Sequence, residues 1–540
     1  MIRINELSLS LDHPEEALTQ AILQRLKISA EDLIGFAVFK RSYDARKKNS
    51  EIKFVYIVDV DVHNPAPILQ RFANDSHVKQ SPDTHYYPVA SAPEHLKERP
   101  IIIGFGPCGL FAALTLAQMG FKPIVLERGR DVRTRTKDTW SLWRKKKLTP
   151  ESNVQFGEGG AGLFSDGKLY SQIKDPKFYG RKVMQEFVRA GAPEEIMYVS
   201  KPHIGTFRLT GVVAAMREEI IALGGEVRFE SKVTDLLIEN GRVCGVELAS
   251  GEQLPSHYVI LALGHSARDT FRMMHDRGVF MEPKSFAIGF RIEHPQSLID
   301  EARLGKYAGH PALGAADYKL VYHAKNGRAV YSFCMCPGGT VVAATSETGR
   351  VVTNGMSQYS RNERNANAGI VVGITPEQDF PGGPLAGVEL QEKLESLAFE
   401  LGGKDYCAPG QLVGDFIKGI PSSTLGEIEP SYKPGILLGD LAKSLPSYAI
   451  EAIREALPAF GKQIRGFDRD DAVLTGIETR TSSPLRITRD RDTLQSLNTR
   501  GLYPSGEGAG YAGGILSAGV DGIKVAEALA TTMLADIAVN

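Results

Sequence analysis

Cysteine and long hydrophobic runs are both scarce in this sequence. The 540 residues include five cysteines, odd in number and scattered along the chain, which excludes the disulfide framework of a small secreted protein. No apolar run approaches the roughly 18–20 residues needed to cross a bilayer. The first residues also lack the basic and apolar regions of a secretory signal. We therefore expect a cytoplasmic, reduced protein with no membrane partner.

An excess of charge of either sign is missing too. Lys and Arg number 63 against 64 Asp and Glu, so the net charge is -1. Such a balance gives the whole molecule no attraction to nucleic acid or to an anionic membrane. The length exceeds what one hydrophobic core supports and suggests about three or four domain-sized units.

Residues 1–95 are interpreted as a small α+β module followed by a linker. Apolar periodicity gives the order strand, helix, strand, strand, which favours a ferredoxin-like unit. From residue 63 onward Pro, Asn, Ser and Asp predominate, which is typical of a linker, with a short helix at 68–73. The predicted strands are 2–8, 34–42 and 52–62, and the predicted helix is 14–27.

The rest of the chain is predicted to be α/β. Residues 96–284 form the first part of a Rossmann-type domain, in which Asn240-Gly241 marks a hairpin. Residues 285–425 are strand-rich and irregular, and we interpret them as an inserted substrate or cap domain. Residues 426–540 complete the Rossmann-type domain with short strands, glycine clusters and a closing helix.

A dinucleotide-binding fingerprint follows the strand predicted at 100–104. The sequence GFGPCG at 104–109 leads into an apolar helix. Gly104 allows the tight turn, Gly106 lets the backbone approach a pyrophosphate, and Gly109 lets helix and strand pack closely. Glu127 ends the next strand, 23 residues after Gly104, where a carboxylate is expected to accept both ribose hydroxyls. The alternative, an ordinary glycine turn, leaves the strand, the helix and the acid unexplained.

Segments outside this unit favour FAD over NAD. Arg128-Gly129 is a continuation common beside the FAD adenosine, and GEGGAGLFSDGKL at 157–169 could wrap a long cofactor or form a surface loop. Near the C-terminus GLYPSGEGAG at 501–510 leads through Gly513-Gly514-Ile515 into a helix. Its acid, Glu507, can bind a ribityl hydroxyl, and the helix start can stabilise negative charge on a reduced flavin.

These strings resemble a family of FAD-dependent proteins often labelled NAD(FAD)-utilizing dehydrogenases, whose FAD domain is of the glutathione-reductase type. The resemblance spans nearly the whole chain. It includes SNVQFG at 152–157, FCMCPGG at 333–339, VTNGMS at 352–357 and the glycine-rich strings above. It implies the cofactor and the fold, but no substrate.

The resemblance also implies further FAD contacts. The backbone of Val233 would meet the adenine, and the strand that ends at Ala262-Leu263-Gly264 would cross the cofactor. Glu507 stands where related flavoproteins usually have aspartate. The predicted FAD-contacting residues are Gly104, Gly106, Pro107, Gly109, Glu127, Arg128, Gly160, Gly162, Lys168, Leu169, Val233, Ala262, Gly264, Gly506, Glu507, Gly514 and Ile515.

Candidate catalytic residues come from two further segments. Cys334 and Cys336 share one face of a regular strand, so both could face a cleft as redox thiols, although a disulfide between them would be strained. The alternative is two small buried strand residues, and no metal-ligand spacing accompanies them. No second GxGxxG follows a strand, which argues against the disulfide reductases that bind NAD(P)H in a separate domain.

The segment TGIETRTSSP at 475–484 is the second. Related folds bring it to the isoalloxazine ring, so the resemblance implies that Glu478 and Arg480 line the active site, with Arg480 holding an anionic substrate or flavin charge. The alternative is a surface ion pair. His203 and His265 are either general acid–base groups or structural histidines. The predicted catalytic set is Arg480, Glu478 and Cys336, with Asn354 facing the same cleft.

These features predict an FAD-dependent oxidoreductase that moves a hydride or two electrons between a small-molecule substrate and FAD. NAD(P)H or a protein electron carrier would be a transient partner. One alternative is a flavin-dependent RNA-modifying factor that docks RNA on the basic loop at 40–48, although most such runs are solvated loops. The other is a non-catalytic flavoprotein that acts as a sensor or binding module.

Overall fold

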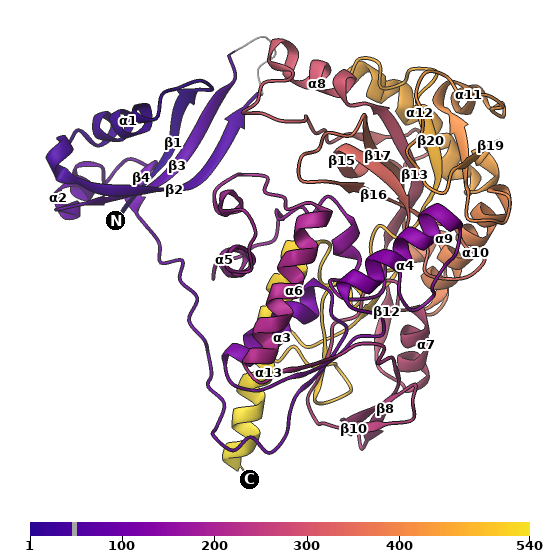
Figure 1. Ribbon diagram of the computed structural model, residues 1–540, viewed down its shortest axis with the longest axis horizontal. Coiled ribbons are helices and arrows are strands. Elements are labelled where there is room, and N and C mark those ends of the chain that lie inside the picture. The colour runs from indigo at the N-terminus through magenta and orange to yellow at the C-terminus, as the bar shows by residue number, and fades with distance from the viewer. Residues whose placement is uncertain (46–50, 540) are drawn as a thin grey trace.

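The computed structural model describes residues 1–45 and 51–539. An N-terminal module stands at one side, a Rossmann-type domain lies below it in the view of Figure 1, and a second, sheet-based domain lies opposite the module. Arg46, Lys47 and Lys48 of the predicted basic loop lie outside the described residues. Within the described part of the chain, no helix is both long and apolar enough to cross a membrane.

The N-terminal module is ferredoxin-like, as the sequence predicts. Its sheet has the order β2-β3-β1-β4, and its elements alternate as βαββαβ. The segment predicted as a linker from residue 63 supplies the last helix and strand of this unit. Pro65 occupies the first turn of that helix, where a missing N–H costs nothing. The elements are β1 (Ile2–Ser10), α1 (Glu16–Leu26), β2 (Leu33–Asp44), β3 (Lys53–Val62), α2 (Pro65–Arg71) and β4 (Val78–Gln80).

Strand β2 fastens this module to the rest of the chain. The N–H of Arg41 donates to the carbonyl of Tyr198 at 2.6 Å, and the N–H of Ser200 donates to the carbonyl of Arg41 at 2.9 Å. The guanidinium of Arg181 also lies over the ring of Phe39, 4.8 Å from its centroid. Arg41, which belongs to the predicted RNA-docking loop, is thus held within an internal contact.

The Rossmann-type domain is built on a parallel five-stranded sheet of order β22-β11-β5-β6-β7. The closing helix α13 packs along α3 (Figure 1). Gly522 makes this approach possible, since a Cβ there would lie 2.2 Å from the carbonyl oxygen of Cys108. The elements are β5 (Ile101–Ile103), α3 (Pro107–Gln118), β6 (Ile124–Leu126), α4 (Val132–Lys145), α5 (Tyr179–Arg189), α6 (Thr206–Ala222), β7 (Glu226–Arg228), β11 (Val259–Leu261), β22 (Leu502–Pro504) and α13 (Ile515–Val539).

Helix α4 has no counterpart among the sequence predictions. Its residues are largely basic and polar, so apolar periodicity gives little signal. The usable signal is its N-cap, because the Asp131 carboxylate accepts from the N–H groups of Arg133 at 3.0 Å and Thr134 at 3.2 Å. The predicted hairpin is present, with φ of 49° at Asn240 and 71° at Gly241. It joins β8 (Val233–Glu239) to β9 (Arg242–Leu248), and β10 (Gln253–Pro255) completes that small sheet.

The second domain is organised by a large sheet that runs β14-β15-β17-β13-β20-β18-β19, with β16 beside β15. The predicted boundary at residue 425 is wrong, because β19 and β20 from the later segment pair with β18 and β13 of this sheet. Local sequence patterns do not show that a late strand inserts between two earlier ones. The strands are β13 (Phe286–Pro295), β14 (Val321–His323), β15 (Ala329–Ala343), β16 (Thr353–Ser357), β17 (Asn365–Ile374), β18 (Ala408–Leu412), β19 (Ile436–Leu438) and β20 (Val473–Glu478).

Helices cover this sheet, although the sequence predicted a strand-rich domain. Helix α10 supplies the buried Glu395 described below. The helices are α8 (Gln296–Leu304), α9 (Pro376–Asp379), α10 (Ala386–Leu401), α11 (Val413–Lys418) and α12 (Ser447–Gln463). The elements between the two domains are α7 (Arg268–Asp276), β12 (Met281–Pro283) and β21 (Leu485–Ile487).

Candidate functional site

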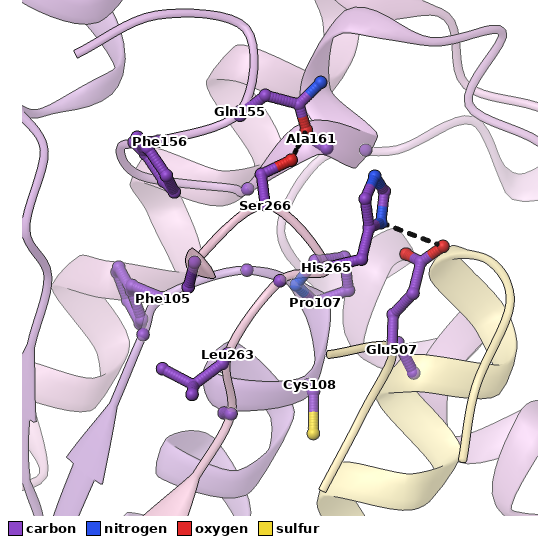
Figure 2. A pocket seen from close by; sticks show the side chains of 18 of the residues that line it. Phe105, Pro107, Cys108, Gln155, Phe156, Ala161, Leu263, His265, Ser266 and Glu507 are labelled. Carbon is purple, nitrogen blue, oxygen red and sulfur yellow. Dashed lines mark hydrogen bonds and ion pairs between the residues drawn. The ribbon is translucent and has the colours of Figure 1, made fainter. Parts of the chain in front are cut away.

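A cavity of about 370 Å³ lies where the two large domains meet. Its walls are the glycine turn after β5, the loop 155–170, the end of β11 and the start of α13. The second domain adds Phe333, Cys334 and Asn354. Figure 2 shows the part around the glycine turn, where His265 points toward Glu507 and Ser266 points toward Gln155.

The glycine turn places an uncapped helix start against this cavity. Gly104 has φ of +99°, and a Cβ there would lie 2.5 Å from the carbonyl oxygen of Ala262. Gly106 is the N-cap of α3 and provides no side-chain cap. The first N–H groups of a helix have no intrahelical acceptor, and the helix dipole favours an anion there. The donor set therefore fits a pyrophosphate.

Glu127 holds the walls of the cavity together. One of its oxygens accepts from the N–H of Phe105 at 2.9 Å, and the other accepts from Gly129 at 2.8 Å and Gly157 at 3.0 Å. A carboxylate offers about four acceptor positions, so one remains for a ribose hydroxyl. Glu127 also fixes the glycine turn relative to the loop that begins at Gly157, a role that its sequence position did not suggest.

Most residues predicted to contact FAD line this one cavity. Gly109 does not, because a Cβ there would lie 2.0 Å from the Gly104 carbonyl, so its place is in helix–strand packing. Leu169 is buried in the core, and Gly506 forms a turn behind Cys108. The residues that line the cavity are Gly104, Gly106, Pro107, Glu127, Arg128, Gly160, Gly162, Lys168, Val233, Ala262, Gly264, Glu507, Gly514 and Ile515.

Of the two candidate histidines, only His265 faces the cavity. Its Nδ1 lies 3.4 Å from a carboxylate oxygen of Glu507 (Figure 2). His203 instead has its Nε2 2.9 Å from the carbonyl oxygen of Tyr359 and its ring stacked on the Tyr359 ring. Burial lowers the pKa of His203. His203 is therefore a structural histidine.

Arg480 reaches the cavity with its charge already paired. Its Nε and Nη2 donate to the buried carboxylate of Glu395 at 3.0 and 2.8 Å, and its Nη1 donates to Ser266 at 2.9 Å and Ser346 at 2.8 Å. The Glu395 carboxylate is shared with Arg268 at 2.7 and 3.0 Å, so it offsets only part of the Arg480 charge. Because four of the five N–H donors of Arg480 are used within the protein, the geometry does not favour the predicted role as an anion anchor. Glu395 comes from α10, a helix that the sequence did not predict.

Glu478 does not line the cavity, contrary to prediction. Its carboxylate accepts from Nε and Nη2 of Arg291 at 2.9 and 3.0 Å, and from the hydroxyl of Thr353 at 3.2 Å. Burial raises the pKa of Glu478, and the Arg291 charge opposes that shift. The pair is structural and lies behind the cavity wall.

Cys334, and not Cys336, is the cysteine of the CxC segment that lines the cavity. Register shifts flank Cys336 in β15, and Cys334 has φ of +44°. This bulge breaks the alternation of side chains along the strand, so Cys334 lines the cavity, whereas Cys336 is fully buried. The prediction that Cys336 faces the cleft is wrong, and the CxC motif points instead to Cys334. Asn354 lines the cavity as predicted, beside Phe333 and Tyr170, which sequence reasoning missed.

No group of three or more His, Cys, Asp and Glu side chains is placed to hold a metal ion in residues 1–45 and 51–539. The cavity is lined by two helix starts, backbone N–H groups, the side chains of Lys168 and Lys232, and those of Cys108 and Cys334.

Comparison with known proteins identifies the family. Residues 285–481 match the model of the FAD-dependent protein, C-terminal domain-like family, and residues 1–61 match a domain of unknown function, DUF8436. A protein of Clostridium beijerinckii, described as uncharacterized, is 51% identical over 528 residues, which are 97% of this chain and 98% of the relative. The chain belongs to this family of FAD-dependent proteins. FAD is its cofactor, and the cavity fits it, from the Val233 end through the uncapped α3 to the start of α13.

Solved structures match the chain with low scores. Glycine oxidase from Bacillus cereus is 11% identical and covers 80% of this chain and 97% of its own, with a TM-score of 0.35. Fructosyl amine:oxygen oxidoreductase (amadoriase I) from Aspergillus fumigatus is 14% identical and covers 83% and 90%, with a TM-score of 0.36. We infer nothing about the reaction from these matches.

Changing Glu127 to Ala should weaken FAD binding by roughly 1.5–3 kcal/mol, the scale of a charge-assisted pair of hydrogen bonds. Glu127→Gln keeps one acceptor oxygen and should give an intermediate loss. Titration of apoprotein with FAD, followed by the change in flavin fluorescence, measures both. An unchanged Kd in the two variants would remove Glu127 from the binding site.

Proposed function

We propose that this protein is an FAD-dependent oxidoreductase that moves a hydride or two electrons between a small-molecule substrate and FAD. The observation that carries the proposal is the shared cavity. The residues expected to hold the dinucleotide and the side chains of Lys168, Cys334 and Asn354 line one continuous space. A protein that merely stored FAD would need no chemically active side chains at that end.

Different residues along the cavity would hold different parts of FAD. Glu127 and Val233 would hold the adenosine part, and the N–H groups at the start of α3 would hold the pyrophosphate. The start of α13, at Gly514 and Ile515, would lie against the flavin. FAD, when bound, supplies the two-electron oxidation and reduction.

The second domain supplies the cover that hydride transfer needs. Reacting atoms must approach within about 3–3.5 Å in a site with little water, and the Rossmann-type domain alone leaves its cradle open. Several hydrogen bonds link the second domain to the FAD-binding domain, and two of them are made to neighbouring carbonyls. Trp143 Nε1 donates to the carbonyl of Ala343 at 2.9 Å, and Gln155 Nε2 donates to that of Ala344 at 3.0 Å.

Anaerobic stopped-flow absorbance of the purified holoprotein tests the proposal. NADH, NADPH and a panel of metabolites are mixed separately with the oxidised protein, and dithionite serves as the control for reducible flavin. We expect at least one donor to remove the oxidised-flavin absorbance at a catalytic rate. Reduction by dithionite alone would favour a sensor or binding protein. Copurifying tRNA would favour the RNA-modifying alternative.

A further inference from the structure

Cys334 differs from the other sulfur atom at the cavity, that of Cys108. Cys108 is 4% exposed, and burial raises the pKa of its thiol to about 12, which makes it a poor nucleophile. Cys334 projects from the β15 bulge into the part of the cavity lined by Lys168, Asn354 and Phe333. Within the described residues these two are the cysteines at the cavity wall.

The groups around Cys334 stabilise negative charge on its sulfur. The neighbouring Cys336 thiol and the charges of Lys168 and Arg291 lower the pKa of Cys334 against the effect of burial. The Cys336 thiol itself donates to the backbone carbonyl of Cys334 at 3.3 Å. The neighbouring Cys334 thiol and burial raise the pKa of Cys336.

The remaining ionisable groups nearby do not cancel this effect. Glu478 is paired with Arg291 and offsets part of the Arg291 charge, while the Lys168 charge also acts on Cys334. Asp166 is paired with Arg361 and lies 3.8 Å from the Lys168 ammonium. Burial raises the pKa of Tyr318 and of Tyr170, so both phenols stay neutral.

One guanidinium places Cys334 and Asn354 side by side. Arg291 Nη1 donates to the backbone carbonyl of Cys334 at 2.8 Å, and its Nη2 donates to Oδ1 of Asn354 at 3.2 Å. Oδ1 of Asn354 also accepts from the N–H of Gly355 at 2.8 Å. With its oxygen held twice, Asn354 keeps its NH₂ group as a donor for the cavity that it lines. Arg291 itself is fully buried and acts as a positioning residue.

A nucleophilic thiol beside an oriented amide donor is the arrangement for addition to a carbonyl group. We propose that the protein oxidises an aldehyde at the substrate end of this cavity. Cys334 is the covalent nucleophile, and the Asn354 amide donates a hydrogen bond to the developing oxyanion. The inference rests on the proposed function and names the substrate class of the same site.

The steps balance as follows. The Cys334 sulfur adds to the aldehyde carbon, and the carbonyl oxygen takes up negative charge against the Asn354 N–H. As the oxygen re-forms its double bond, hydride leaves that carbon for the oxidised flavin, which gives a thioester on Cys334 and a flavin reduced by two electrons. Water then cleaves the thioester to the carboxylic acid and returns the thiol. In total, aldehyde, water and oxidised flavin become acid and reduced flavin.

Thiol reactivity provides the first test, independent of turnover. In a Cys244→Ser/Cys407→Ser background, which removes two partly exposed thiols, iodoacetamide labelling of Cys334 in the holoprotein is followed against pH by peptide mass. We expect the midpoint of the curve of labelling rate against pH to lie well below about 8.5, the pKa of free cysteine. Cys336→Ala should move the midpoint to higher pH, because the variant removes the neighbouring thiol that lowers the pKa of Cys334. A midpoint at or above the ordinary value overturns the proposal.

Aldehydes provide the second test. Acetaldehyde, hexanal and benzaldehyde are mixed anaerobically with the oxidised holoprotein. The mass of the acid-quenched protein is then measured by mass spectrometry. We expect flavin reduction and an acyl adduct on Cys334 with at least one of them, and neither in Cys334→Ser. Asn354→Ala should slow flavin reduction by the aldehyde about 100-fold. The pH dependence of iodoacetamide labelling at Cys334 should stay unchanged in this variant.

Three outcomes would overturn the assignment. One is reduction at an unchanged rate in Cys334→Ser. Another is reduction of the flavin by NADH or NADPH but by none of the aldehydes. That result would overturn the aldehyde assignment and would leave the proposed function intact. The third is a mixed disulfide on Cys334 after reaction with oxidised glutathione, with no acyl adduct from any aldehyde, which would replace the aldehyde by a disulfide substrate.

Discussion

Gly106→Val should give a folded protein that has lost its yellow colour. Gly106 has φ of -77°, which any residue adopts, and a Cβ there would be in ordinary contact, 3.5 Å from Cα of Gly160. The γ carbons of valine would then occupy the space in front of the first N–H groups of α3. We expect FAD affinity to fall roughly 100-fold, equivalent to about 3 kcal/mol, measured as FAD absorbance per chain and as Kd.

Two companion variants separate cofactor loss from misfolding. Gly106→Ala adds only the tolerated Cβ and should lose much less affinity. Gly109→Ala would place a Cβ 2.0 Å from the Gly104 carbonyl, so it should lower stability as well as FAD content. Circular dichroism and thermal unfolding of the apoproteins distinguish the two effects. Full FAD occupancy in Gly106→Val would show that the phosphate site lies elsewhere.

Glu478→Ala should lower the free energy of unfolding by about 3–5 kcal/mol, because it leaves the fully buried Arg291 without its counter-charge. Urea denaturation of the holoprotein measures the loss. The double variant Arg291→Met/Glu478→Leu removes both charges and should recover most of the stability. It should not recover flavin reduction, because Cys334 and Asn354 lose their shared partner.

A different result for Glu478 would restore its predicted catalytic role. If Glu478→Ala kept the stability of the parent protein but lost flavin reduction, the carboxylate would be acting on the substrate. Glu478→Gln helps the distinction, since the amide fills the same space but lacks the charge that Arg291 requires.

The parts that sequence reasoning predicted well depend on local chemistry. The roles of Gly104, Gly106 and Gly109 follow from a turn, a phosphate and a close packing contact within one βαβ unit. The hairpin at Asn240-Gly241 is likewise encoded in two adjacent residues. Most of the predicted FAD contacts belong to such short segments, which is why they reach one cavity.

The errors arise where distant segments decide the outcome. The partners of Arg480 cannot be found from its local sequence, because Glu395 lies 85 residues earlier and Ser266 lies 214 residues earlier. Cys334 and Cys336 were assigned one face because strand alternation was assumed, and the bulge in β15 appears only when that strand is paired with β17. The boundary at residue 425 failed because β20 inserts between β13 and β18.

The place of β22 in the parallel sheet has a consequence for how this protein is made. β22 (Leu502–Pro504) is an outer strand beside β11, and α13 after it covers α3. Strands that lie about 400 residues apart in the sequence, β5 and β22, are thus needed for one sheet. A ribosome synthesises several hundred residues between β6 and β22, and throughout that time the apolar side of α3 lacks its cover. The five-stranded sheet, and the part of the cavity formed by the start of α13, can therefore be completed only after the last helix has left the ribosome.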